Sequence, residues 1–185
     1  MSAAGYKSLT CKEAPSKEGA VLVWREVVPN IKPTGLYTLK EDYFRSFPQY
    51  SWDYNKDGKR PYYYAIKDKY GFMWMIPITT KVESVKSKIA KEEAKRGKGN
   101  CDLYYIGKIA GEERGFKVGE MFPVTEEYVL HNYAINNKPY FVRDSTLNNA
   151  LNTKAHRFLS LIEKRAIKPS VDVLAVRDLL KRNGD

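Results

Sequence analysis

The sequence predicts an α+β fold, in which a twisted, barrel-like antiparallel β-sheet carries peripheral helices and the C-terminal third is helical. Two observations lead to this prediction. Between residues 20 and 142, short runs rich in Val, Ile, Tyr and Trp alternate with turn residues, which is typical of an antiparallel sheet. From Leu147 onward, apolar residues such as Leu151, Phe158 and Ile162 recur at helical spacing. Strands followed by helices favour a sheet on which helices pack.

Length and composition are those of one folded domain preceded by an irregular arm. The chain has 185 residues, 43% of them hydrophobic and 29% charged, which is enough to bury a core. Residues 1–19 carry Gly, Ser, Lys and Pro with little periodicity. We therefore expect a flexible N-terminal arm over 1–19 and a single domain over 20–185.

The sequence also favours a cytoplasmic protein that does not associate with a membrane. No apolar run approaches the roughly 20 residues of a membrane span. The N-terminus lacks the apolar centre of a secretion signal. Cys11 and Cys101 form neither a disulfide framework nor a metal-binding cluster.

The elements of the first half are expected from β-branched runs, helical spacing and turn residues. Proline at position 48 ends the first helix, because proline cannot donate a backbone hydrogen bond. The segment 29–35 holds two prolines and a glycine and is expected to be a turn. The predicted strands cover 20–28, 36–39, 61–68 and 72–79, and the predicted helix covers 40–47.

A second helix is expected over 81–96. Thr80 and Glu83 fit a capping box, in which Thr80 is the N-cap residue. Gly97 is suited to ending the helix. Its first turn would then follow directly on the strand that ends at residue 79.

The remaining elements are two hairpins and two helices. Residues 102–110 and 116–124 are expected to pair around a turn at 112–115. Strands over 128–135 and 138–142 flank Asn136-Asn137, and asparagine tolerates the left-handed backbone of a tight turn. After the helix that contains Leu147, a last helix is expected beyond Pro169, with Ser170 as its N-cap.

Net charge and aromatic content indicate a nucleic-acid partner. The chain has 32 Lys and Arg against 22 Asp and Glu, which gives a net charge of +10. A basic domain attracts polyanions through phosphate neutralisation and counterion release. Its 14 tyrosines are suited to stacking on unpaired bases. The alternative interpretation is a tyrosine-rich β-core with a solvated basic surface.

A candidate site lies where strands 61–68 and 72–79 meet. If the two strands are antiparallel, the start of one lies beside the end of the other, and cations and hydroxyls gather there. Such a cluster suits a phosphodiester, because it offers charged donors without a carboxylate cage for a metal. The N-terminus of the following helix would add backbone donors. The residues predicted to form this phosphate site are Tyr54, Lys59, Arg60, Thr79, Thr80 and Lys81. The further residues predicted to bind a nucleic acid are Lys56, Tyr62, Lys86, Lys88, Lys91, Lys95 and Arg96.

Other chemistry has less support in the sequence. His131 and His156 invite an acid–base mechanism that uses two imidazoles, but packing or surface roles are the alternative for both. No His, Cys, Asp or Glu cluster has the spacing of metal ligands, so we predict neither a metal nor a cofactor. Glycine-rich phosphate loops and nucleophile elbows are absent from the sequence.

The order of these motifs resembles the toxins of type III toxin–antitoxin systems, namely the ToxN/AbiQ endoribonucleases and their CptN and TenpN relatives. The resemblance covers residues 36–81. It depends most on the basic-Pro-aromatic strand start Lys59-Arg-Pro-Tyr62 and on the strand end Ile76-Pro-Ile-Thr-Thr-Lys81. The hydroxyl pair and lysine of the family match Thr79, Thr80 and Lys81. Its upstream tyrosine and basic residue match Tyr54 and either Arg60 or Lys59. In better-known members the lysine is separated from the hydroxyl pair, whereas here it follows directly.

The resemblance implies a metal-independent endoribonuclease that cleaves single-stranded cellular RNA, in which the six residues of the phosphate site are catalytic and the further residues bind RNA. It also implies inhibition by a small folded RNA antitoxin, assembly with it into a closed protein–RNA hetero-oligomer, and a role in phage defence. We expect the ribose 2′-OH to attack its own 3′-phosphate, which leaves a 2′,3′-cyclic phosphate and a 5′-OH end. The main alternative is a noncatalytic RNA-binding module, and a third is a DNA-binding or structural protein.

Overall fold

The computed structural model describes residues 31–48, 55 and 58–184. The predicted N-terminal arm and the predicted strand over 20–28 lie outside these residues, as do the predicted site residues Tyr54 and Lys56. Within the described part of the chain, no helix is long and apolar enough to cross a membrane.

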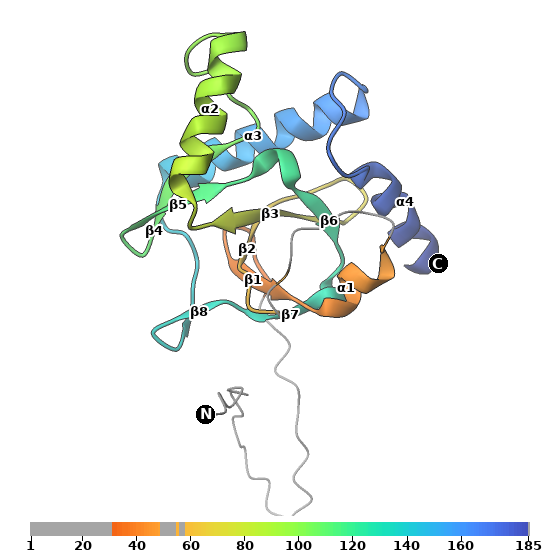
Figure 1. The fold of residues 1–185 in the computed structure, drawn as a ribbon. Coiled ribbons are helices and arrows are strands. Elements are labelled where there is room, and N and C mark those ends of the chain that lie inside the picture. The colour runs from red at the N-terminus through yellow and green to blue at the C-terminus, as the bar shows by residue number, and fades with distance from the viewer. Residues whose placement is uncertain (1–30, 49–54, 56–57, 185) are drawn as a thin grey trace, which may run out of the picture.

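A seven-stranded antiparallel sheet forms the centre of the fold, in the order β4-β5-β3-β2-β1-β7 with β6 also paired to β3 (Figure 1). The strands are β1 (Leu36–Leu39), β2 (Tyr62–Lys67), β3 (Met73–Thr79), β4 (Tyr105–Ile109), β5 (Glu112–Phe116), β6 (Phe122–Val124) and β7 (Val129–Asn132). The predicted α+β class is confirmed. Strands β4 and β7 are the two ends of this order, so the barrel is not closed.

Strand β3 is the central strand because it has partners on both sides. It pairs with β2 along its length, while its other edge pairs first with β6 and then, at Ile78 and Thr79, with β5. Residues 73–78 are all buried. A continuous apolar run is what a strand covered on both faces requires. Strand β3 is therefore held by β2 on one side as far as Pro77, and its last two residues, Ile78 and Thr79, are held by β5.

Four α-helices of the described residues surround the sheet (Figure 1). Helix α3 packs on β2, α4 packs on β6, and the start of α2 packs on β4 and β5, from which the rest of α2 projects (Figure 1). Helix α1 joins β1 to the segment before β2. The helices are α1 (Glu41–Ser46), α2 (Val82–Arg96), α3 (Ser145–Glu163) and α4 (Val173–Gly184), with short 3₁₀ turns η1 (Val118–Glu120) and η2 (Glu126–Tyr128).

An aromatic cluster around Tyr43 fixes α1 against the sheet. The Tyr43 ring stacks on Phe122 of β6 with centroids 5.4 Å apart, and it meets Phe47 and Tyr128 edge-on. Its hydroxyl donates a 2.7 Å hydrogen bond to the carbonyl of Pro123. Burial raises the pKa of Tyr43 well above its ordinary value. The described tyrosines thus serve the core as well as the surface.

Two hairpin predictions have different outcomes. The turn at Asn136 and Asn137 is confirmed: both residues have positive φ, 52° and 59°, and they join β8 (Ala134–Ile135) to β9 (Lys138–Pro139). The predicted turn at 112–115 is wrong, because these residues belong to β5. The turn lies at Ala110 and Gly111, with φ of 50° and 86°. Glycine there supplies the left-handed conformation that a tight hairpin needs.

The predicted N-cap of the last helix is also wrong. Helix α4 begins at Val173 rather than directly after Ser170. The side chain of Asp172 accepts a 3.1 Å hydrogen bond from the amide of Ala175. A carboxylate immediately before the helix satisfies a free amide of the first turn, which Ser170 is too distant in sequence to reach.

Candidate functional site

The two strand ends that carry the predicted site lie next to each other. Strands β2 and β3 are antiparallel, and Tyr62 is opposite Pro77. This pairing is the one the sequence predicted. Arg60 lies two residues before Tyr62, and Thr79 lies two residues after Pro77. The residues between, Pro61 and Ile78, line one hollow of about 360 Å³.

Arg60 is held at the start of β2 with its side chain largely covered. The residue is 8% exposed, and its guanidinium carbon lies 5.8 Å from the centre of the Tyr62 ring. Its amide donates a 3.2 Å hydrogen bond to the carbonyl of Asn55. A cation on an aromatic face is held in one orientation, so Arg60 is a positioned charge.

Asn55 and Glu41 organise the segment that precedes Arg60. The side-chain amide of Asn55 donates to the carbonyl of Leu39 (3.1 Å) and to Glu41 Oε1 (2.8 Å). The same Glu41 oxygen accepts a 2.9 Å hydrogen bond from the amide of Gly58. Together these bonds tie the segment to β1 and α1, and they leave the side chain of Lys59 exposed to solvent.

Tyr62 does not fit its predicted role in RNA binding. Its ring is 1% exposed and meets Phe122 edge-on within the core. Its hydroxyl donates a 2.9 Å hydrogen bond to Asn55 Oδ1. A ring buried in this way has no free face for a base to stack on. The prediction is corrected: Tyr62 packs in the core and helps to hold Asn55 and Arg60.

The predicted capping box at the start of α2 is also wrong. Lys81 is the N-cap, and its side chain makes no capping hydrogen bond. The hydroxyl of Thr79 accepts a 3.1 Å hydrogen bond from the amide of Lys81. Glu83 pairs with Lys86 at 2.8 Å and so is not used for capping. The helix begins one residue later than expected because a hydroxyl from the end of the strand takes the amide first.

At the end of β3, the hydroxyl groups of Thr79 and Thr80 can donate hydrogen bonds to a ligand. Thr79 is half-buried and uses an acceptor lone pair for the amide of Lys81, so its proton is available to donate. Thr80 and Lys81 are exposed. The first amides of a helix also point outward from its N-terminus, which favours an anion nearby.

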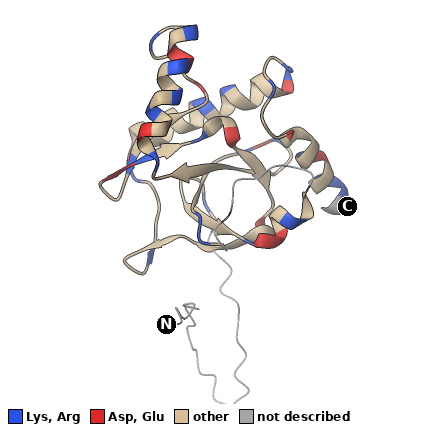
Figure 2. Cartoon of the chain, viewed as in Figure 1, with Lys and Arg blue, Asp and Glu red and all other residues tan. Residues whose placement is uncertain are grey.

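Lysines at the strand ends differ from the cations of α2 in whether they form ion pairs with carboxylates. Among the described residues, no carboxylate forms an ion pair with Lys59 or Lys81. Helix α2 carries both signs of charge along its length (Figure 2), and most of its cations are paired. The pairs are Lys86 with Glu83 and Glu113, Lys88 with Glu120, and both Lys95 and Arg96 with Glu92. The hydrogen bond that Lys86 donates to Glu83 raises the pKa of Lys86.

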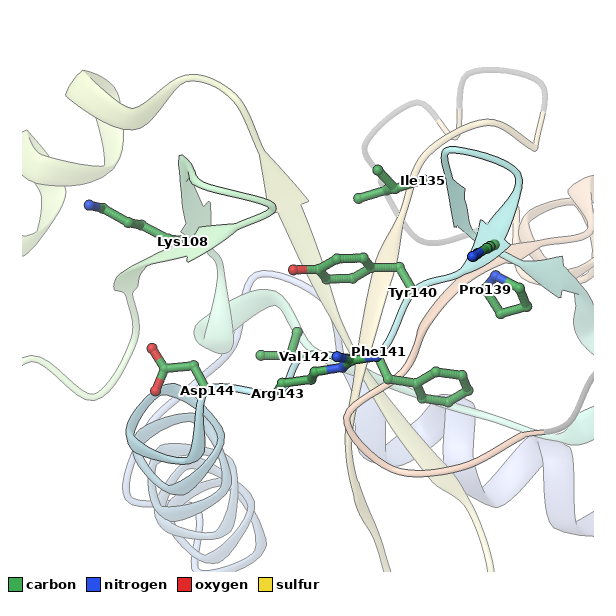
Figure 3. A pocket seen from close by; sticks show the side chains of 9 residues that line it. Lys108, Ile135, Pro139, Tyr140, Phe141, Val142, Arg143 and Asp144 are labelled. Carbon is green, nitrogen blue, oxygen red and sulfur yellow. The ribbon is translucent and has the colours of Figure 1, made fainter.

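Sequence reasoning missed a second hollow of about 360 Å³, which lies beside the first. It lies between the β4–β5 and β8–β9 hairpins, and Lys108, Lys138 and Arg143 line it (Figure 3). The ring of Tyr140 points toward the β4–β5 turn, where its hydroxyl accepts a 2.8 Å hydrogen bond from the amide of Ala110 (Figure 3). A signal was present: residues 138–140 read Lys-Pro-Tyr, the same basic-Pro-Tyr order as residues 60–62.

The histidines lie away from both hollows. His131 is on the edge strand β7 opposite Thr38, and partial burial lowers its pKa. His156 is exposed on α3. Neither residue lines the hollows described above. In the described part of the chain, no group of three or more His, Cys, Asp and Glu could hold a metal ion.

Comparison with known proteins finds a similar fold among solved structures. No protein-family model and no curated protein matches the sequence. Among solved structures, the chain is similar to AbiQ, a lactococcal anti-phage endoribonuclease of the type III toxin–antitoxin system, with a TM-score of 0.50 and 11% identity over 68% of this chain and 80% of AbiQ. A structure from work on bacterial type III systems, in which a non-coding RNA pseudoknot selectively inhibits the toxin, matches with a TM-score of 0.33 and 17% identity over 73% of this chain and 74% of the other. The second likeness is too weak to support an argument. The likeness to AbiQ shows a shared fold, which confirms the predicted resemblance at that level.

Proposed function

We propose that this chain is a metal-independent endoribonuclease toxin of a type III toxin–antitoxin system, which cleaves single-stranded RNA. The observation that carries the proposal is that an AbiQ-like fold has the hydroxyls of Thr79 and Thr80 and the cations Lys59, Arg60 and Lys81 where the two central strands begin and end. At 11% identity the fold does not by itself establish an activity. Support therefore comes from the chemistry of these side chains, which suits a phosphodiester.

In the proposed reaction the RNA supplies its own nucleophile. The 2′-OH attacks the adjacent phosphorus, the bond from phosphorus to the 5′ oxygen breaks, and the products are a 2′,3′-cyclic phosphate and a 5′-OH end. Lys81 and Arg60 stabilise the charge that develops on the non-bridging oxygens. Thr79 and Thr80 position the phosphate through hydroxyl donors. The protein therefore contributes alignment and electrostatic stabilisation.

Two protons must also move. One leaves the 2′-OH, and one reaches the 5′ oxygen as it departs. We propose that Lys59 or Tyr54 serves in one of these steps. A lysine with its ordinary pKa of about 10.4 is charged at neutral pH and is better suited to donating a proton than to removing one. Lys59 is exposed and has no carboxylate partner among the described residues, so it is suited to donating to the leaving oxygen.

The antitoxin in this proposal is a small folded RNA that binds the toxin in a closed protein–RNA hetero-oligomer. We propose that five cations of α2 attract both the antitoxin RNA and the substrate RNA. They are Lys86, Lys88, Lys91, Lys95 and Arg96. Because most of these cations already have carboxylate partners, their contribution is a long-range attraction that salt screens. Close phosphate contacts are assigned to the strand ends.

Incubation of the purified protein with single-stranded RNA in EDTA tests the reaction. We expect cleavage to persist, with cyclic phosphate and 5′-OH ends. Loss of cleavage on chelation would contradict a metal-independent mechanism. An oligonucleotide with a 2′-deoxyribose at the cleaved position should remain intact, and its cleavage would contradict attack by the 2′-OH.

The Lys81→Ala variant separates catalysis from binding. We expect turnover to fall far more than RNA affinity, with Lys168→Ala, an exposed lysine in the segment before α4, as the matched control. If the unaltered protein shows no cleavage while Lys81→Ala loses affinity, the chain is instead a noncatalytic RNA-binding module.

A further inference from the structure

We propose that the space between the β4–β5 and β8–β9 hairpins is a track for single-stranded RNA, and that it holds the nucleotides next to the cleaved bond. We name this space the hairpin groove. It comprises the two hollows, and the cations that line the outer hollow are Lys108, Lys138 and Arg143. The inference rests on the proposed function for the position of the cleaved bond. The binding of single-stranded RNA is argued from the geometry and charge of the groove.

The lining of the groove lies one residue along the backbone from Arg60 and from Thr79 of the candidate site. Its two hollows, each of about 360 Å³, share the side chain of Ile135. The hollow nearer the sheet is also lined by Pro61 and Ile78, the direct neighbours of Arg60 and Thr79 in the chain. Consecutive Cα atoms are about 3.8 Å apart. A strand of RNA bound at the strand ends therefore has the groove as its adjoining surface.

The hollow lined by Lys108, Lys138 and Arg143 holds three cations and one carboxylate, Asp144. Lys108, Lys138 and Arg143 are exposed, and no ion pair joins them to any acidic residue within the part of the chain that the structure describes. Asp144 also lines the groove, but its carboxylate accepts a 3.1 Å hydrogen bond from the amide of Leu147 and caps α3. The lining of this hollow, three cations and one carboxylate, therefore keeps an excess of positive charge for phosphate groups, whereas most cations of α2 are paired with carboxylates.

Arg114 in the hollow nearer the sheet is different, because it forms an ion pair with Glu112. That hollow has an apolar lining as well, which includes Ile109, Tyr133 and Ile135. A basic track beside apolar and aromatic surface is the combination that binds unpaired nucleotides, because the phosphates meet the charges and the bases meet the apolar faces. In a duplex the bases are already stacked and paired, so the groove favours a single strand.

The wall between the two hollows is fixed in advance. The hydroxyl of Tyr140 accepts from the amide of Ala110 (2.8 Å), which ties one hairpin to the other. The backbone of Tyr140 accepts a hydrogen bond from Leu36 (3.1 Å) and donates one to Tyr133 (3.0 Å). Each volume is within the range of about 300–1,000 Å³ that is usual for ligand pockets. A preformed site of this size binds without the cost of ordering a loop.

The test is the double variant Lys138→Ala/Arg143→Ala, compared with Lys168→Ala/Arg182→Ala, which removes the same charge from exposed positions in and near α4. The probe is a 2′-O-methylated RNA of about 12 nucleotides, which lacks the attacking hydroxyl and covers a usual single-strand site. Each single-strand phosphate contact contributes about 0.7 to the slope of log affinity against log salt concentration, so two lost contacts reduce the slope by about 1.4. The advantage of the unaltered protein over the groove variant should then shrink about 7-fold between about 50 and about 200 mM salt.

The expected result is weaker binding and a shallower slope for the groove variant, no such change for the control variant, and recovery of the slope in Lys138→Arg/Arg143→Lys, which keeps both charges. Groove and control variants that behave alike would overturn the proposal. A loss confined to a duplex probe of the same length would also overturn it, because the surface would then bind folded RNA.

Cleavage of unmodified RNA by the unaltered protein is measured in parallel. Its absence would overturn the proposed function, and with it the placement of the groove beside a cleaved bond. Cleavage that persists, together with binding that is insensitive to the groove variant, would overturn the groove alone.

Discussion

Replacing Gly115 with alanine tests how closely strand β5 holds both the candidate site and the start of α2. Gly115 lies opposite Thr79 in the sheet. A Cβ atom at this position would lie 2.5 Å from Cγ2 of Val85 and 3.1 Å from Cγ2 of Thr79. Val85 is buried, with 2% of its surface exposed, so it has no free space into which to move. Either the helix or the end of β3 must shift.

Overpacking a core of this kind costs about 1–3 kcal/mol, and we expect Gly115→Ala to reduce the free energy of unfolding by about 2 kcal/mol. Val85→Ala removes two methyl groups, each worth about 0.8 kcal/mol on burial, and leaves a small cavity, so it should also cost about 2 kcal/mol. In the double variant the new methyl group occupies part of that cavity. The two changes together should then cost about 2 kcal/mol rather than about 4 kcal/mol.

Urea unfolding of the two single variants and the double variant gives these energies, and cleavage of single-stranded RNA under folding conditions gives the functional effect. We expect Gly115→Ala to lower turnover because Thr79 is displaced, and the double variant to recover part of it. An additive loss of about 4 kcal/mol would show that the Val85 contact is not the constraint. Unchanged turnover in Gly115→Ala would show that the position of Thr79 does not matter to the reaction.

Three further predictions concern other parts of the molecule. Arg177→Leu removes a largely buried cation that lies 2.8 Å from Glu163 and 3.9 Å from Asp68. It should lower the free energy of unfolding, measured in urea, by about 3 kcal/mol and leave RNA cleavage intact. A loss below about 0.5 kcal/mol would contradict this. Burial raises the pKa of Tyr63 above the ordinary 10.0, because the folded protein disfavours the ionised phenol. The free energy of unfolding should therefore be independent of Tyr63 ionisation below about pH 10 and decrease as the pH rises further. In Tyr63→Phe, the urea midpoint should fall less steeply over that range. Replacing the ion-paired cations of α2 with glutamine should weaken RNA binding less than the two substitutions in the hairpin groove, and a larger effect on α2 would place the main RNA contacts there.

Much of the fold could be predicted because its central strands are continuous apolar runs. Strand β3 was expected over 72–79 and is found over 73–79, and its pairing with β2 followed from the short connection between them. The turn in the β4–β5 hairpin was misplaced for a physical reason. Residues 112–115 are charged or small and look like a turn, but they form a strand whose first residues are solvent-exposed. The actual turn uses Ala110 in a left-handed conformation that its identity does not suggest.

The candidate site was predictable where neighbouring strands create it and not where distant segments do. Lys59 and Lys81 lie at the ends of adjoining strands, so a sequence pattern could bring their segments together. Lys108 and Arg143 come from a hairpin and from the residue before the N-cap of α3, and no local pattern links them. The burial of Tyr62 was likewise a tertiary effect, since a tyrosine beside basic residues is compatible with a surface as well as with a core.

The hydrogen bonds of Asn55 have a consequence for the stage of synthesis at which the candidate site is assembled. Asn55 connects the backbone of Leu39, the carboxylate of Glu41 and the hydroxyl of Tyr62. We therefore expect Arg60 to reach its final position only after β1, α1 and β2 have come together. The other half of the proposed site needs Gly115 opposite Thr79, which a ribosome adds much later. Contacts between segments so far apart form late in folding. Under the proposed function, the nuclease site is therefore complete only when translation of the domain is well advanced, so that an antitoxin RNA already present meets the protein as the site forms.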